Sequence, residues 1–264
     1  MNVLILGSGG RLGTLLQAAW PQDGQTNPTW YNRTALDVLR DRQGLEDACA
    51  GTNRIILLAG VTANARGKSF DDNIKLAEAT LDAALGKPVF LSSTAAVYGA
   101  LPSPLHESHA GAPVSDYGRS KQLMEEVASK HPNATCLRIG NVVGGDALLG
   151  VNRPHYTVHQ FPSGEYVSRS YIGPSMLAHV LAALCIERNA LPPILNLATS
   201  KAVAMNELLD AAGKSWSAEP APASAMERVE LDTTLLRSIV PIGAGQSTAE
   251  ALVNDWQSVI GHQG

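Results

Sequence analysis

The sequence is poor in the features that mark secreted, metal-binding or nucleic-acid-binding proteins. Its 264 residues include only three widely scattered cysteines, which form neither a disulfide framework nor a cluster with the spacing of metal ligands. The formal net charge is −4. Without a basic excess, nucleic acid and anionic membrane surfaces have no electrostatic support as partners. A small molecule is therefore the expected ligand.

Long apolar runs are also missing. The two longest, Ile55 to Val61 and Met176 to Ile186, fall short of the roughly 20 residues that a membrane-spanning helix needs. The N-terminus lacks the basic segment of an export signal, because Met1-Asn2 leads directly into an apolar run. These observations predict a soluble cytoplasmic protein with no membrane partner.

Strand-like and helix-like segments alternate along most of the chain. Between the apolar runs, residues such as Leu12, Leu15 and Leu16 recur with helical spacing, and a later helix is expected around 174–186. Alternation of this kind predicts an α/β fold with a doubly wound parallel sheet, in which ligands bind at the carboxyl ends of the strands. The expected strands are Val3–Leu6, Thr29–Tyr31, Ile55–Ala59, Pro88–Leu91, Thr135–Ile139 and Ile194–Leu197.

A glycine-rich turn follows the first expected strand, with glycines at positions 7, 9, 10 and 13. Glycine permits a tight turn and a close approach of the backbone to a pyrophosphate, and the following helix offers unpaired N–H groups. An ordinary strand-to-helix turn is the alternative. The place of the turn at the first strand of an alternating chain favours a dinucleotide-binding (Rossmann) site.

The choice of cofactor is expected to depend on the end of the second strand, where Asn32 and Arg33 stand in the region that often holds an acid in NAD-binding proteins. Arg33 can pair with a 2′-phosphate, and Arg11 in the glycine turn could assist it. The sequence therefore favours NADP over NAD. In the alternative, Arg33 is a solvated surface residue and the cofactor is selected elsewhere.

A pair of titratable residues, Tyr117 and Lys121, lies four residues apart at the start of an expected helix, so both share one face. A lysine cation near a phenol lowers the phenol pKa, which suits proton transfer at a carbonyl oxygen. Ser93 and Thr94, at the end of a neighbouring strand, both offer a hydroxyl to a substrate oxygen. The combination indicates hydride and proton transfer at a carbonyl or alcohol.

Several segments resemble the extended short-chain dehydrogenase/reductases, the NAD(P)-dependent epimerase/dehydratase family, over about the first 200 residues: Gly7–Gly13, Leu57–Gly60, Ser92–Gly99, Tyr117–Lys121 and Arg138–Gly144. The resemblance implies that Thr94 is the catalytic hydroxyl, Tyr117 the general acid/base and Lys121 the residue that bonds the nicotinamide ribose. Together with the motifs above, the resemblance gives the full set of expected cofactor-binding residues: Gly7, Gly9, Gly10, Arg11, Leu12, Gly13, Asn32, Arg33, Asp37, Val38, Leu58, Ala59, Gly60, Asn73, Ser92, Tyr117 and Lys121.

Substrate contacts are expected where the chain crosses the open edge of the site. Arg169 would recognise an anionic group there, although its segment lacks the Asp and His of the family pattern. His155 and His159 are more plausible as substrate contacts than as metal ligands, because no acid or cysteine cluster accompanies them. The full expected substrate set is Ser93, Thr94, Asn141, His155, His159 and Arg169.

The domain plan expected from these segments has two parts. Residues 1–145, with 174–200 returning to the sheet, form the dinucleotide-binding domain, and residues 146–173 and 201–264 form a small, largely helical substrate-binding lobe.

Three functions remain open at this point. The leading one is an NAD(P)-dependent oxidoreductase or epimerase acting on a sugar nucleotide or a similar hydroxylated compound, with some resemblance to the dTDP-4-dehydrorhamnose reductase branch. The others are reduction of a small non-nucleotide carbonyl and a non-catalytic dinucleotide sensor or scaffold. A homodimer is a further expectation, and no metal is expected.

Overall fold

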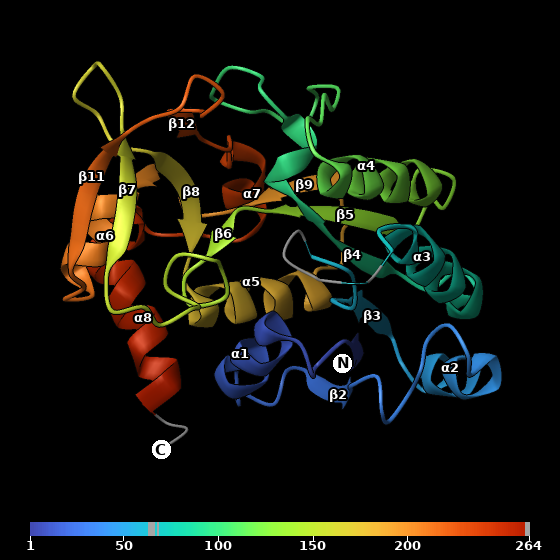
Figure 1. Ribbon diagram of the computed structural model, residues 1–264. Helices are drawn as coiled ribbons and strands as arrows, with labels where there is room; N and C mark the ends of the chain where they lie inside the picture. The colour runs from blue at the N-terminus through green and yellow to red at the C-terminus, as the bar shows by residue number, and fades with distance from the viewer. Residues whose placement is uncertain (63–66, 68, 262–264) are drawn as a thin grey trace.

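A six-stranded parallel sheet forms the centre of the protein in the computed structural model, which describes residues 1–62, 67 and 69–261 (Figure 1). The strands run in the order β2-β1-β3-β4-β5-β9, and each neighbouring pair is parallel. The chain moves to opposite sides of β1 for β2 and β3, and such a reversal leaves a crevice at the carboxyl ends. The strands are β1 Asn2–Leu6, β2 Asn27–Tyr31, β3 Arg54–Leu57, β4 Val89–Thr94, β5 Ala134–Ile139 and β9 Ile194–Leu197.

Helices cover both faces of this sheet (Figure 1). The alternation of side chains along β1 decides which residues face which helical layer. Val3 and Ile5 pack toward one layer, whereas Leu4 and Leu6 pack toward the other. The first layer holds α1 (Arg11–Ala19), α5 (Pro174–Ile186) and α7 (Thr234–Ile239), and the second holds α2 (Arg42–Ala50), α3 (Asp71–Ala84) and α4 (Asp116–Ala128). The predicted doubly wound fold is confirmed.

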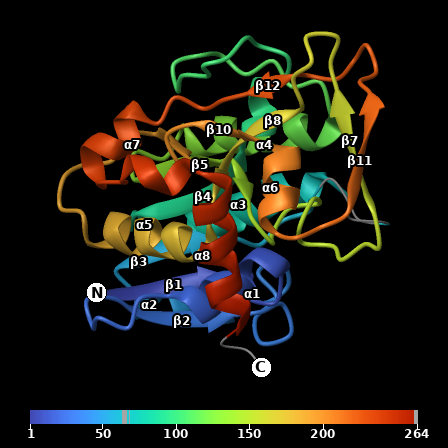
Figure 2. The same ribbon diagram turned by 90° about the vertical axis from the view of Figure 1, so that its left-hand side faces the viewer.

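The C-terminal lobe contains more strand than the sequence predicts (Figure 2). Strand β8 lies between β10 and β12 and also pairs with β6, while β7 and β11 form a separate parallel ribbon. The expectation of a largely helical lobe is wrong because these strands are short and their partners are distant in sequence. The elements are β6 Asn141–Val142, β7 Tyr156–Gln160, β8 Ser168–Ile172, β10 Ala202–Ala204, α6 Met205–Ala211, β11 Trp216–Pro220, β12 Arg228–Val229 and α8 Ala249–Gly261.

The last helix, α8, connects the lobe to the sheet domain through contacts with α1, α5 and α6. The carboxylate of its Asp255 accepts hydrogen bonds from the backbone N–H groups of Ser175 and Met176, at 2.8 and 3.0 Å, and so caps α5. A Cβ on Gly173 would lie only 2.3 Å from the carboxyl carbon of Asp255. Glycine at this position therefore leaves room for the cap.

Within the residues described, no helix is both long and apolar enough to cross a membrane.

Candidate active site

The glycine turn between β1 and α1 brings three backbone segments into close contact. Gly7 has φ +108°, and a Cβ there would lie 2.4 Å from the backbone nitrogen of Ala59, after β3. A Cβ on Gly13 would lie 2.4 Å from the carbonyl oxygen of Gly7. Helix α1 begins after Gly10 without a side-chain cap, so its first N–H groups face the turn unpaired. This geometry suits a pyrophosphate, as in other dinucleotide sites.

The segment after β2 places two predicted cofactor residues against each other. The guanidinium of Arg33 lies 3.3 Å from the carboxylate of Asp37, and 65% of the Arg33 side chain is exposed. The backbone N–H of Leu39 and the Arg33 cation hold the pKa of Asp37 below its ordinary value, against the opposing effect of burial. Asn32 shapes the segment by accepting hydrogen bonds from the next backbone N–H groups. The side chain of Val38 packs in the core beneath it, and its cofactor contact stays a prediction.

Arg11 does not lie beside Arg33. Its guanidinium donates to the carbonyl oxygens of Gly145 and Asp146, at 3.5 and 3.0 Å, in the loop that follows β6. Arg11 therefore ties the glycine turn to the C-terminal lobe, and the prediction that it assists a 2′-phosphate finds no support in this arrangement.

The loop after β3 is held by a buried amide. Leu58 and Ala59 pack on the cores of the two layers, and their N–H groups both donate to the carbonyl of Leu6. The side chain of Asn73, on α3, donates to the carbonyl of Val61 and accepts from its N–H. Asn73 is 1% exposed. It supports the cofactor loop from behind, which differs from the direct cofactor contact that the resemblance implies.

The predicted catalytic residues meet where β4 ends beside α4. Ser115 caps α4 by accepting the N–H of Gly118 at 3.1 Å, which fixes Tyr117 in the first turn. The hydroxyl of Thr94 lies near the phenol of Tyr117. Burial raises the pKa of Tyr117, and the neighbouring Thr94 hydroxyl acts in the opposite direction. Tyr117 is therefore a protonated phenol at neutral pH, ready to donate a proton.

Lys121 lies on the same face of α4 but turns toward the strand. Its ammonium donates to the carbonyl of Ser92 at 2.7 Å, and burial lowers its pKa to about 8. The sequence predicts that this cation lowers the pKa of Tyr117, whereas the structure shows a pKa raised by burial, with no lowering by Lys121. The ammonium is bonded instead to the carbonyl of Ser92.

Ser93 occupies a different place from its neighbour Thr94. Successive residues of a strand point to opposite faces, and the Ser93 hydroxyl donates to the buried carboxylate of Glu125. The substrate contact predicted for Ser93 is therefore corrected to a contact within the protein. Glu125 and its ion-pair partner Arg138 were not among the predicted site residues. The position of Glu125, four residues after Lys121, is the sequence signal that could have found it.

Arg169, on β8, is a half-buried cation without a carboxylate partner in the part of the chain that the structure describes. It donates to the carbonyl oxygens of Ser168 at 2.7 Å and Met226 at 3.0 Å. Burial lowers its pKa. Asn141, on β6, is the register partner of the fully buried Tyr171 on β8. These contacts leave Arg169 able to bind an anion.

His155 and His159 lie along the ribbon of β7 and β11. The ring nitrogens of His155 lie 3.0 and 2.9 Å from the hydroxyls of Ser215 and Ser217, and His159 lies 3.1 Å from Glu219. Both imidazoles are thus engaged by the neighbouring strand. Their role in substrate contact stays a prediction.

The chain also matches a known protein family over the segments that form this site. The profile described as the NAD dependent epimerase/dehydratase family matches residues 3–160. The chain belongs to this family. The match spans the glycine turn, Thr94, Tyr117 and Lys121, so the enzyme type predicted from the sequence, a short-chain dehydrogenase/reductase, is confirmed.

Two curated relatives are epimerases. The UDP-glucose 4-epimerase of Azospirillum brasilense is 31% identical over an alignment of 189 residues, and the match covers 60% of this chain and 53% of the relative. The N-acetyl-alpha-D-glucosaminyl-diphospho-ditrans,octacis-undecaprenol 4-epimerase of Escherichia coli is 31% identical over an alignment of 139 residues, and the match covers 48% of this chain and 42% of the relative. The matched part therefore spans about half the length of these relatives.

Solved structures share the fold across the whole chain. A UDP-glucose 4-epimerase from Stenotrophomonas maltophila, with NAD and formylated UDP-arabinopyranose, has a TM-score of 0.78 at 20% identity and covers 100% of both chains. The protein RMD from Pseudomonas aeruginosa, with NADPH, has a TM-score of 0.73 at 19% identity and covers 97% of both chains. The neighbours thus bind either NAD or NADPH.

Proposed function

We propose that this protein uses a nicotinamide dinucleotide to transfer a hydride to or from a hydroxyl-bearing or keto carbon of a sugar linked to a diphosphate. The observation that supports this function most is the meeting of Thr94 and Tyr117 at the carboxyl end of β4, where the ammonium of Lys121 donates to the carbonyl of Ser92. The cofactor supplies the hydride acceptor or donor. Thr94 orients the substrate oxygen, and Tyr117 exchanges the proton with it.

A diphosphate-linked sugar is favoured by two observations. Arg169 is a half-buried cation whose partners are carbonyl groups, and a phosphate would supply its missing negative charge. The two curated relatives are named for a UDP-sugar and for a sugar on an undecaprenol diphosphate, so both substrates carry a diphosphate. Reduction of a small uncharged carbonyl is the second candidate, because it would require no anion-binding residue.

We propose NADP as the preferred cofactor, on the basis of the exposed Arg33 after β2. Its pairing with Asp37 is a surface contact of little energy, so the guanidinium is free to exchange it for a 2′-phosphate. Asp37 works in the other direction, since its carboxylate can accept the ribose hydroxyls of NAD. The cytoplasmic location and the homodimer stay predictions.

The function can be tested with purified protein, NADPH or NAD, and a panel of UDP-linked and dTDP-linked hexoses and 4-keto hexoses. Net reduction or oxidation changes the nicotinamide absorbance, whereas a 4-epimerase returns the hydride and changes only the sugar, which chromatography of the products detects. Tyr117→Phe is the control for background reaction. A binding-competent protein that changes neither absorbance nor sugar with any of these substrates would rule out the proposed function.

A further inference from the structure

The short 3₁₀ helix η1 (Ala95–Tyr98) contacts the elements that carry both residues proposed for proton transfer. It begins directly after Thr94, whose hydroxyl accepts the N–H of Ala96 at 3.2 Å and so caps it. It also packs on the first turn of α4, where a Cβ on Gly118 would lie 2.7 Å from the carbonyl oxygen of Ala96. Because Gly118 directly follows Tyr117, the position of η1 sets how Thr94 and Tyr117 lie relative to each other.

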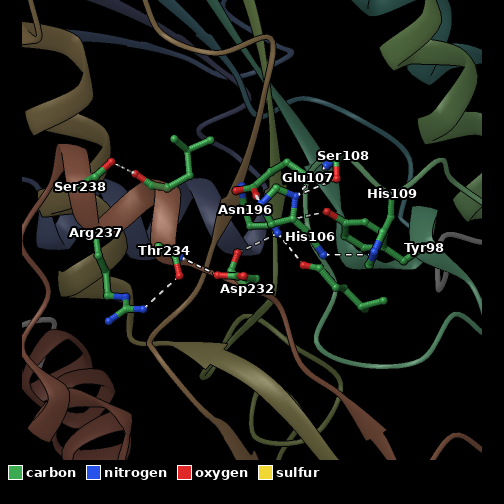
Figure 3. Close-up of polar contacts among 12 residues, drawn as sticks. Tyr98, His106, Glu107, Ser108, His109, Asn196, Asp232, Thr234, Arg237 and Ser238 are labelled. Atoms are coloured by element: carbon green, nitrogen blue, oxygen red, sulfur yellow. Dashed lines mark hydrogen bonds and ion pairs between the residues drawn. The ribbon is translucent and has the colours of Figure 1, made fainter.

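Tyr98, the last residue of η1, anchors this helix in the interior of the protein. Its side chain is fully buried, and the guanidinium of Arg138, on β5, lies 4.5 Å from the centroid of its ring. Its hydroxyl donates to the amide oxygen of Asn196, on β9, at 2.8 Å (Figure 3). A phenylalanine would fill the same space, so the hydroxyl adds one specific bond to the packing of the ring.

The acceptor of this bond, Asn196, is itself held in place. Its amide nitrogen donates to the carbonyl oxygens of Leu105 and Asp232, both at 2.9 Å, and its backbone N–H donates to the carboxylate of Glu107 at 3.0 Å. Asn196 is fully buried. Because both protons of the amide are engaged, the side chain cannot rotate without breaking buried hydrogen bonds. The Tyr98 hydroxyl therefore binds to a fixed point on the sheet.

The residue before Thr94 is held as well. The hydroxyl of Ser93 donates to the carboxylate of Glu125, which Arg138 binds through two hydrogen bonds of 3.0 and 2.7 Å. Arg138 thus acts on both sides of Thr94, through Glu125 before it and at the ring of Tyr98 after it. Removing the Tyr98 hydroxyl leaves this buried ion pair intact, so its effect can be measured without leaving a charge unpaired.

We propose that Tyr98 is a positioning residue of the active site: its hydrogen bond to Asn196 fixes η1, and η1 in turn sets the Thr94 hydroxyl against the phenol of Tyr117. The inference rests on the roles proposed above for Thr94 and Tyr117. Both hydroxyls must lie within hydrogen-bonding reach of the same substrate oxygen, and a small displacement of one of them slows proton transfer. Tyr98 is fully buried, so it acts through Thr94.

The first test uses the cofactor-free protein and NMR of tyrosine labelled with ¹³C at Cζ, a carbon whose chemical shift responds to hydrogen bonding of the phenol. Tyr117→Phe assigns the Tyr117 signal, and Thr94→Ala shows how this signal changes when the neighbouring hydroxyl is lost. We expect Tyr98→Phe to move the Tyr117 signal in the same direction as Thr94→Ala, because η1 is no longer anchored and Thr94 moves with it.

The matched control is Tyr156→Phe in the lobe. It also removes a buried phenol hydroxyl, which donates to the carbonyl of Val151 at 2.9 Å, and it should lower the melting temperature by a similar amount while the Tyr117 signal stays unchanged. Tyr98→Phe should fold, because it keeps the ring beneath Arg138 and loses one hydroxyl. A folded Tyr98→Phe protein with the wild-type Tyr117 signal would overturn the inference.

Turnover of a sugar nucleotide from the panel above gives the second test. Tyr98→Phe should lower kcat about 3- to 10-fold, the range for one lost hydrogen bond, and leave the Michaelis constant and the NADPH affinity nearly unchanged. In a Thr94→Ala background the same substitution should have no further effect, because Tyr98 acts through Thr94. An equal loss in both backgrounds would make Tyr98 a structural residue only.

The two tests also separate this inference from the proposed function. If NADPH or NAD binds but no sugar nucleotide of the panel is converted by the wild-type protein, the proposed function fails. The Tyr117 signal then still decides whether Tyr98 sets the position of Thr94.

Discussion

At the end of β4 the two titratable catalytic side chains, Tyr117 and Lys121, lie on a single long helix, α4, whereas in the lobe Arg169 lies on β8, which pairs with strands of only two or three residues. The first region is built on one continuous element, and the second on several short backbone pairings with the side-chain bonds of Ser168 and Ser170. Regions with fewer such bonds open more readily. The comparison indicates that the chemistry is preorganised while the substrate-binding part can adjust to its ligand.

Tyr117→Phe tests the preorganised region at the end of β4 and should have the largest effect. Removing the phenol hydroxyl should lower turnover about 10²- to 10⁴-fold, as expected for the loss of a general acid/base, and leave NADPH affinity nearly unchanged. Turnover and fluorescence titration of NADPH measure the two effects. The matched control is Tyr166→Phe in the lobe, and near-wild-type turnover of the Tyr117 variant would remove the acid/base assignment.

Lys121→Met tests how much the buried charge beside β4 lowers the free energy of unfolding. The Lys121 pKa is about 8 in the folded protein and 10.5 ordinarily, so only the unfolded chain binds this proton between these values. The wild-type free energy of unfolding should therefore rise with pH from about 8 to 10.5, through this group. Below pH 8 the buried charge of Lys121 lowers the free energy of unfolding by its full cost of about 3 kcal/mol.

We therefore expect Lys121→Met to have a larger free energy of unfolding than the wild type at pH 7. The lost hydrogen bond to the carbonyl of Ser92 offsets part of this gain. The difference between variant and wild type should shrink by pH 9.5. Urea denaturation at both pH values measures it. A difference in stability that does not change with pH would contradict the expectation.

Arg169→Ala tests the lobe. If Arg169 binds the diphosphate, the Michaelis constant should rise about tenfold or more while turnover changes little, because a contact remote from the reacting carbon is largely uniform binding. Arg228→Ala is the matched control, since Arg228 is an exposed cation on the adjacent β12, paired with Glu230. An unchanged Michaelis constant with a lower melting temperature would make Arg169 a structural residue of the lobe.

Arg33→Ala should have the smallest effect, because the side chain is exposed. We expect the preference for NADP over NAD to fall about tenfold or less, as for one charge-assisted contact at a solvated site. Asp37→Asn should act in the opposite direction and weaken NAD. Calorimetry measures both affinities, with Arg42→Ala as the control because Arg42 makes a similar surface pair. Tighter NAD than NADP in the wild type would contradict the cofactor proposal.

The sheet domain could be predicted from the sequence because its signals are local. Pro174 at the first turn of α5 and the apolar run of β9 place these two elements where the structure has them. The ribbon of β7 and β11 was missed because Tyr156 pairs with Trp216, 60 residues away in the sequence, and an exposed strand ending in Pro220 has no apolar alternation.

In the candidate site, too, contacts between elements that are distant in the sequence could not be predicted. The spacing of Tyr117 and Lys121 predicts a shared helix face, but the carbonyl of Ser92 that takes the ammonium belongs to another element. The alternation of a strand could have placed Ser93 opposite Thr94. Nothing in the sequence shows that Arg169 meets carbonyl groups rather than an acid, because only one of them belongs to its neighbour Ser168 and the other to the distant Met226.

The contacts of α8 with α1 and α5 also set the order in which the protein can be completed during synthesis. The ribosome produces α1 and α5 before α8, so the surfaces of α1 and α5 that α8 covers stay exposed until α8 has emerged. The cap that Asp255 provides to α5 is absent until then. The sheet domain therefore passes through a nascent state with uncovered apolar surface, in which chaperones or neighbouring chains compete with α8 for the same face.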